Sequence, residues 1–231
     1  RRYRAGNIVL AVAGRTSWST VMELAEKHCS HWPTGGVARE PIAAHPQRAT
    51  EFISREQSQQ EQVIQLAPAP SGTDPRRFAA EMLSVIVGDE TNSRLYWDLV
   101  EPGLVDAAET GYFEYEGAGT YMTFLSCSPE STKDNLNRIA RLYSEVNERG
   151  VTNEELEQAR NKVATRIVLR GERPMGRLNS LGSNWLFRGE YRSVADDLAT
   201  LRAITLDDIE QLLGAFPLMQ TTTVGVGPLT V

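Results

Sequence analysis

The hydrophobic pattern of this chain changes its period near Ser128, and that change constrains the fold more than any other feature of the sequence. Before it, residues 106–116 and 118–127 are predicted to form a strand pair, with alternating side chains along the second strand. After it, apolar residues recur every three or four positions, as they do on one face of a helix. A final run at 220–226 predicts a closing strand. Strands followed by a series of helices indicate an α+β fold.

The N-terminal part of the chain is predicted to be separate from the rest. Residues 7–13 form an apolar, Val-rich run that predicts a buried strand, and a helix capped by Ser17 or Ser19 follows it. Three prolines and two adjacent glycines at 32–48 indicate a linker. We therefore divide the chain into residues 1–31, the linker at 32–48 and a domain at 49–231.

The domain at 49–231 is predicted to begin with two strands, at 49–57 and 61–67. Asp74 and Pro75 predict a helix start, because Asp favours the N-cap and Pro the first turn. Thr152 and Glu155 have the spacing of a capping box, in which each residue bonds the backbone of the other. The helices predicted in the second part of the chain start at Ser128 and Thr152 and cover 174–187, 193–202 and 206–214.

Composition excludes two classes of partner. The chain has 231 residues, a hydrophobic fraction of 41% and a net charge of −6, which is ordinary for a globular protein with a buried core. Lys and Arg are scattered, so nucleic acid is not an expected partner. Since no apolar run approaches the ~20 residues that cross a bilayer, we expect no membrane span.

No complete metal site is predicted from the sequence. In the segment HCSHW, His28, Cys29 and His31 are potential ligands, but neighbours on a helix point about 100° apart, and a structural zinc site needs about four ligands. The chain has three histidines and contains neither H-E-x-x-H nor H-x-x-E-H. Cys29 and Cys127 are expected to be free thiols, although pairing is left open.

The stretch GDETNSRLYWDLVEPGLVD at 88–106 raises the question of a functional site. It begins with a turn, carries Tyr96 and Trp97 on an amphipathic segment, and breaks at Pro102-Gly103. Aromatic residues at such positions more often pack in a core than hold a ligand. The simplest interpretation is a helix followed by its stop signal.

Four stretches follow one another in a distinctive order. They are RRYRAGNIVLAVAG, EQSQQEQVIQLAPAP, GDETNSRLYWDLVEPGLVD and GVTNEELEQARNKV. In this order they resemble the carboxy-terminal portion of the pitrilysin/insulinase family of zinc metallopeptidases, which includes mitochondrial processing peptidase. The resemblance implies that residues 1–31 are the last strand and helix of a first repeat, and that 49–231 are the second repeat. It also implies two layers, with a mostly antiparallel sheet and helices packed on one face.

The resemblance implies that zinc lies outside this chain. The family's first repeat carries H-x-x-E-H, whose Glu activates a zinc-bound water, and that repeat would lie upstream of Arg1. The second repeat contributes an Arg and a Tyr near the scissile bond in many members. Here Val100 and Asp106 occupy those positions, and neither side chain can stabilise an oxyanion as a cation or a phenol would. Arg94, Glu101 and Asp106 are the peptide-contact candidates that the resemblance suggests.

Two functions follow from this resemblance. The first is the substrate-clamping domain of a zinc metalloendopeptidase, which would bind an extended peptide at a sheet edge and have no activity alone. The second is a noncatalytic partner or scaffold subunit of a pitrilysin-type heterodimer. The expected partners are an upstream zinc-bearing half or an active homologous subunit, a peptide, and a second copy paired through an exposed strand edge. Bacterial cytoplasm and periplasm both remain open.

Overall fold

The computed structural model describes residues 3–36 and 48–229, and they form two compact units. One unit contains the described N-terminal residues and 165–198, and the other contains the described residues of 43–164 and 199–231. We describe each unit by itself. Most of the predicted linker at 32–48 lies outside the described residues.

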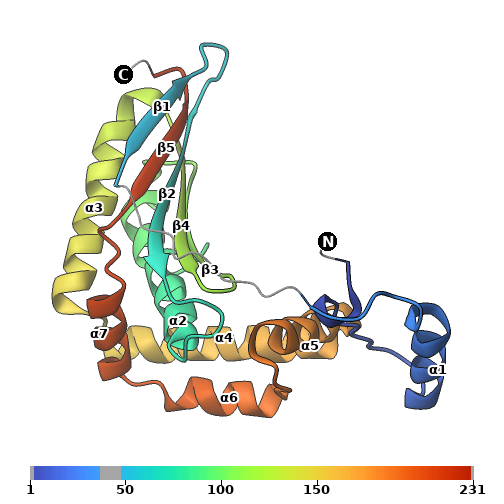
Figure 1. Ribbon diagram of the computed structural model, residues 1–231. Coiled ribbons are helices and arrows are strands. Elements are labelled where there is room, and N and C mark those ends of the chain that lie inside the picture. Colours follow the sequence, from blue (N-terminus) through green and yellow to red (C-terminus); the bar gives the residue numbers. More distant parts are fainter. Residues whose placement is uncertain (1–2, 37–47, 230–231) are drawn as a thin grey trace. The chain divides into compact units, whose positions relative to one another are not determined.

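The larger unit is built on a five-stranded sheet with the order β1-β5-β2-β4-β3 (Figure 1). Its strands are β1 (Thr50–Ser54), β2 (Glu61–Ala69), β3 (Ala107–Glu114), β4 (Gly119–Cys127) and β5 (Thr222–Gly227). Only β1 and β5 pair in parallel, and the other three pairings are antiparallel. The predicted α+β fold with a mostly antiparallel sheet is confirmed, and so are the predicted strands at both ends of this unit.

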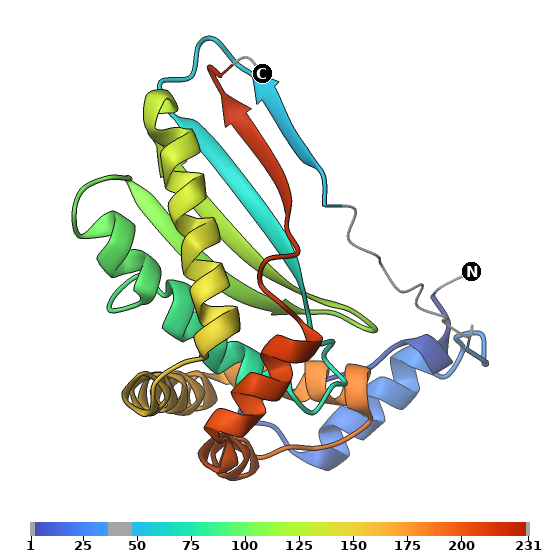
Figure 2. The ribbon, with the colours of Figure 1, turned by 90° about the vertical axis from the view of Figure 1, so that its left-hand side faces the viewer.

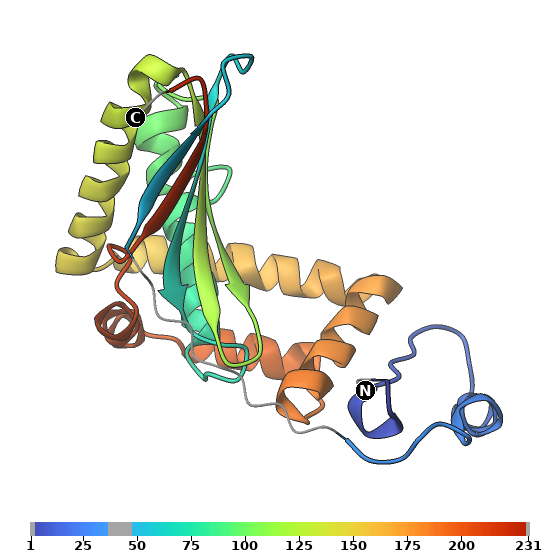
Figure 3. The same cartoon turned by 45° about the horizontal axis from the view of Figure 1, so that its top comes forward.

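Helices cover one face of this sheet. Figure 2 shows α2 (Arg77–Gly88) and α3 (Thr132–Arg149) lying along it, and Figure 3 shows both helices on the same side of the strands. The core between the layers consists of alternate strand residues and the apolar helix stripes; it includes Val63, Tyr121, Leu125, Met82, Leu83, Ile139 and Val146. The predicted two-layer arrangement is therefore confirmed.

Three further helices complete the larger unit or pass into the smaller one. They are α4 (Asn153–Glu172), α6 (Val194–Ala203) and α7 (Leu206–Ala215). The predicted capping box at Thr152 is confirmed, since Thr152 Oγ1 accepts from Glu155 N and the Glu155 carboxylate accepts from Thr152 N. Thr205 caps α7 in the same way with Asp208. These reciprocal bonds satisfy backbone donors that the first turn leaves free.

The start of α2 differs from the prediction. The helix begins at Arg77, two residues beyond Pro75, and Arg76 occupies its N-cap without a side-chain bond. The Asp74 carboxylate instead accepts from the backbone and the guanidinium of Arg76. Asp74 therefore closes a local turn before the helix, because a neighbouring cation competes for the oxygens that would cap it.

The smaller unit contains α1 (Trp18–Cys29), α5 (Pro174–Arg188), the 3-10 turn η1 (Ala5–Asn7) and parts of α4 and α6. Ser17 caps α1, as predicted. The predicted buried strand at 7–13 is wrong: residues 8–13 form no strand, and Leu10 is 63% exposed. A strand needs a neighbour for its backbone groups, and no described strand pairs with this segment.

Every helix in the described part of the chain is too short or too polar to cross a lipid bilayer.

Candidate functional site

The face of the sheet opposite α2 and α3 carries a row of exposed apolar side chains. Register places Ile64 beside Val224 and Ile53 beside Val226. Ile64 is 40% exposed, although the residue before it in β2, Val63, is fully buried. The other exposed apolar side chains of this face are Leu66, Phe113, Val224 and Ile53. We call these five residues the open face; a soluble domain rarely leaves such a row uncovered without a binding role.

The two edge strands differ in how accessible their backbones are. In β1, four of the five residues are exposed. Arg55 N donates to Gly227 O and Thr223 N donates to Ala49 O, so the odd-numbered residues of β1 bond β5. The backbone groups of Thr50, Phe52 and Ser54 consequently point away from the sheet, because bonding alternates along a strand.

At the other edge, α2 lies close to β3. Gly88 ends α2 so near to Thr110 that any β-carbon would overlap the Thr110 backbone. Thr110 itself is buried. The edge formed by β1 is therefore the more accessible of the two.

The segment 89–106 is a turn followed by a short helix, and its sequence had predicted a helix and a stop. Ser93 is buried and organises the turn: its Oγ donates to Asp89 O and accepts from Tyr96 N. The helix then widens into the π-helical turn η2 (Tyr96–Val100), in which Glu101 N donates to Tyr96 O. Gly103, with a φ of 71°, ends it. The predicted helix and stop are confirmed, and the π-helical geometry is new.

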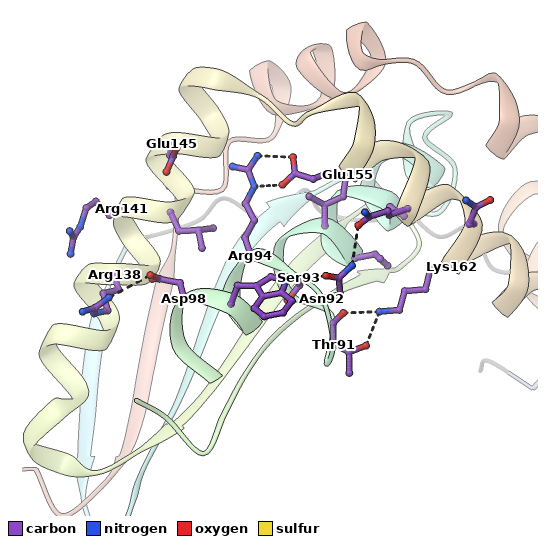
Figure 4. A pocket seen from close by; sticks show the side chains of 17 residues that line it. Thr91, Asn92, Ser93, Arg94, Asp98, Arg138, Arg141, Glu145, Glu155 and Lys162 are labelled. Carbon is purple, nitrogen blue, oxygen red and sulfur yellow. Dashed lines mark hydrogen bonds and ion pairs between the residues drawn. The ribbon is translucent and has the colours of Figure 1, made fainter. Parts of the chain in front are cut away.

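Arg94 links this segment to the start of α4. Its Nε and one terminal nitrogen donate to the two Glu155 carboxylate oxygens at 2.7 and 2.9 Å, and the same terminal nitrogen reaches Gly150 O (Figure 4). Burial alone would raise the pKa of Glu155, but the hydrogen bonds from Arg94 and from Thr152 N outweigh it and hold that pKa below its usual value. The same pairing raises the pKa of Arg94.

The other residues singled out from the sequence make separate contacts. Glu101 accepts a hydrogen bond from the Tyr96 hydroxyl, which raises the pKa of that phenol. Asp106 is exposed just before β3 and accepts from Gln60 Nε2 at 2.8 Å. Val100 is half-buried in η2. Each of the three peptide-contact candidates thus has its own partner, and their role toward a peptide stays a prediction.

A cavity of about 990 Å³ lies between η2, α3 and α4. It is lined by four cations, Arg94, Arg138, Arg141 and Lys162, and by three carboxylates, Asp98, Glu145 and Glu155 (Figure 4). Lys162 donates to Thr91 and pairs with Asp89, and Arg138 lies 3.5 Å from Asp98. No hydrogen bond or ion pair joins Arg141 to another described residue.

This cavity is not evident from the sequence, although the spacing of its charged residues is. Arg138, Arg141 and Glu145 share one face of α3, and Glu155, Gln158 and Lys162 share one face of α4. Charged residues at such spacing usually form a solvated helix face. The charged faces of α3 and α4 line the same cavity only because these two helices and η2 pack around it.

The described residues contain no cluster of three or more His, Cys, Asp or Glu side chains that could hold a metal ion. His28 and Cys29 lie at the end of α1, and His31 lies just beyond it. The residues described therefore do not fit a zinc ion. Cys127 is buried, with its sulfur 3.5 Å from Thr132 Oγ1.

A mostly antiparallel sheet with helices packed on one face is the α+β fold that the resemblance had implied. The sequence model of the family described as "Peptidase M16 inactive domain" matches residues 1–163, and this chain belongs to that family. The predicted relationship to this group of peptidases is confirmed.

Individual relatives agree with this assignment. An uncharacterised zinc protease from Streptomyces coelicolor is 27% identical over 244 residues, which cover 99% of this chain and 52% of the relative. A crystal structure of a peptidase M16 inactive domain from Pseudomonas fluorescens has the same fold, with a TM-score of 0.89, 21% identity and coverage of 99% of this chain and 55% of that one. A chain of Complex III2 from Candida albicans shares the fold with a TM-score of 0.80, 11% identity and coverage of 93% and 54%. The chain spans about half the length of the curated relatives it matches.

Proposed function

We propose that this chain is the noncatalytic, substrate-clamping half of a zinc metalloendopeptidase. Its family and its relatives named as zinc proteases support this proposal. The zinc would be held by the other half of the protein, because the described residues here form no ligand cluster. This half would hold the peptide and shape the chamber in which the other half cuts it.

The observation that carries the proposal is the open face beside an exposed edge. A peptide that pairs with β1 would add a sixth strand through the outward backbone groups of Thr50, Phe52 and Ser54. Its alternate side chains would lie next to Ile53 and the rest of the open face. Backbone pairing gives affinity that does not depend on the sequence of the peptide, and the apolar side chains of the open face would favour extended, apolar peptides.

Residues 1–31 belong, in this proposal, to the fold of the other half. The backbone of Ile8 is extended, but residues 8–13 pair with no described strand, and none of the residues of α1 is buried. Pairing with a strand of the other half would satisfy their backbone and cover Leu10. Two copies of this chain could instead pair through the same exposed segment; a monomeric mass by light scattering at tens of micromolar would argue against that dimer.

A first experiment measures activity and binding of the purified chain separately. We expect no cleavage of a fluorogenic peptide with added zinc, and saturable binding of an extended apolar peptide measured by fluorescence anisotropy. Zinc-dependent hydrolysis that is lost on chelation would overturn the noncatalytic assignment. Absence of any peptide binding would overturn the clamp.

A substitution at the edge tests where the peptide lies. Ser54→Pro removes one outward N–H at an exposed position and leaves the β1–β5 bonds in place. We expect it to weaken peptide binding roughly threefold to tenfold, the cost of about one hydrogen bond. Ser54→Ala is the matched control and should bind as the unmodified chain does. Equal binding by both variants would exclude β1 as the pairing edge.

The alternative is a noncatalytic partner subunit of a heterodimer. The fold shared with a chain of Complex III2 from Candida albicans favours it, since this fold also occurs in a chain of a complex. The two functions predict different sequences for the other half of the protein. Sequencing the gene tests this: an intact zinc motif favours the peptidase, and a degenerate motif favours the partner subunit.

A further inference from the structure

We propose that the cavity between η2, α3 and α4 is a second binding site, which takes a short peptide segment with an apolar side chain next to a carboxylate. This site lies on the helix-covered side of the sheet, away from the open face. It does not depend on the clamp function.

The cavity has an apolar floor and an aromatic wall. Val85, Ile86, Leu142 and Ala159 line it with side chains that are otherwise buried. Trp97 is 57% exposed, and its Nε1 donates to Asn92 Oδ1 at 3.0 Å, which fixes the ring. An exposed, immobilised indole beside apolar groups is a typical anchor for an apolar side chain.

The charges around the cavity select a single negative group. Four cations face three carboxylates, which leaves one positive charge in excess. Within the cavity, Arg94 pairs with Glu155 and Arg138 with Asp98. Two lining residues have partners outside it, Lys162 with Asp89 and Glu145 with Arg149. Arg141 is therefore the lining cation without a partner among the described residues. A guanidinium binds a carboxylate through two parallel hydrogen bonds. One free cation suits one carboxylate, whereas a polyphosphate or nucleic acid would need several, and the chain carries a net charge of −6.

The walls of the cavity are held in place before any ligand binds. Asn92, which has a positive φ of 57°, donates to Gln158 Oε1 at 3.0 Å and so joins the turn to α4. Arg94 and Lys162 make further links between the same two segments. A preorganised site loses little entropy on binding. The volume of about 990 Å³ accommodates two or three residues of a peptide.

Binding of labelled tetrapeptides to the full 231-residue chain tests the proposal. The probe is the tetrapeptide Gly-Leu-Phe-Glu-amide with a fluorophore on its N-terminal amine, so it carries a single carboxylate, and two comparison peptides replace either Glu by Lys or both apolar residues by Ser. We expect saturable binding of the first peptide and at least tenfold weaker binding of the other two, because each lacks one of the two required groups.

Two variants locate the site. Arg141→Glu should weaken binding of the acidic peptide about tenfold, the loss of one hydrogen-bonded charge pair, and Trp97→Ala should weaken it several-fold. Lys133→Glu is the matched control, because Lys133 is exposed on the same helix and does not line the cavity.

Three results would overturn the proposal. They are no saturable binding of the acidic peptide, equal binding of the basic one, and equal effects of Arg141→Glu and Lys133→Glu. Ser54→Pro, which tests the clamp, should leave binding at this cavity unchanged. An experiment that disproves peptide binding at the cavity can therefore be distinguished from one that disproves peptide pairing at β1.

Discussion

The two faces of the central sheet use the same kinds of side chain for opposite purposes. On the face toward α2 and α3, Val63 and Leu125 are buried to within 1% of complete. On the open face, Ile64, which directly follows Val63 in β2, and Leu66, two residues further along the same strand, are about two-fifths exposed. Apolar residues thus stabilise the fold on one side and remain available for a partner on the other, so hydrophobicity alone does not identify a core.

The largest expected effect comes from a matched pair of Leu→Ala substitutions. Leu125 is 1% exposed and Leu66 is 41% exposed. Leu125→Ala should lower the free energy of unfolding by about 2–5 kcal/mol, because it leaves a cavity, whereas Leu66→Ala should change it by less than about 1 kcal/mol. Urea unfolding followed by circular dichroism measures both. Equal losses would mean that the open face is covered in solution.

A second difference concerns polar groups. On the covered face, Tyr143 Oη hydrogen-bonds Thr110 Oγ1 at 3.1 Å and also Thr123 Oγ1, and all three side chains are buried. Tyr143→Phe removes one member of this network and should cost about 1–2 kcal/mol of unfolding free energy. On the open face Gln62 is only half-buried, and Gln62→Ala should cost less than about 0.5 kcal/mol. Equal urea midpoints for Tyr143→Phe and Gln62→Ala would contradict the expected difference between the two faces.

The ion pair on the covered side gives stability that depends on pH. The pKa of Glu155 lies below its usual value of 4.5 in the folded chain. Its contribution is therefore fully present above about pH 4.5 and is lost as the pH falls through the lower folded value. We expect Glu155→Gln to cost about 1 kcal/mol at pH 7 and to cost progressively less in acid. Urea titrations from pH 7 to about pH 3 check this; a constant difference across that range would contradict it.

The smallest effect on stability, and the most informative for binding, is expected from a charge on the open face. Ile64→Lys should change the free energy of unfolding by less than about 0.5 kcal/mol, since the side chain is exposed. It should nevertheless reduce binding of a hydrophobic dye and of the extended peptide. Lys133→Glu, on α3 at the other side of the sheet and outside the cavity, is the comparison variant. Unchanged dye binding in Ile64→Lys would show that the open face is not the hydrophobic surface.

Local pattern predicted most of the fold. Alternation in 118–127 predicted a strand, and the structure buries its Tyr121 and Leu125 on one face. The capping box at Thr152 predicted the start of α4, whose Leu156 and Val163 are buried. Each of these features depends on residues within a few positions of one another, which is the range over which sequence periodicity carries information.

Features that depend on distant partners could not be predicted. Residues 8–13 have the composition of a strand, but a strand forms only where another strand completes its hydrogen bonds. The cavity around Arg141 requires α3, α4 and η2 to converge, although each charged face looks solvated in isolation. The start of α2 differs from the prediction for a local reason: the Asp74 carboxylate accepts from Arg76, two residues away, instead of capping the helix.

The position of β5 has a consequence for how the larger unit is synthesised. β5 comes from residues 222–227 yet lies between β1 and β2, which are separated by only a short connection. On the ribosome, β2, β3 and β4 can associate early, but β1 has no neighbour to pair with until β5 has emerged. Until then an edge of β2 stays exposed to other chains. β5 is made after the four strands that it joins into one sheet, so a chain that stops before β5 is left with an open, aggregation-prone edge on β2.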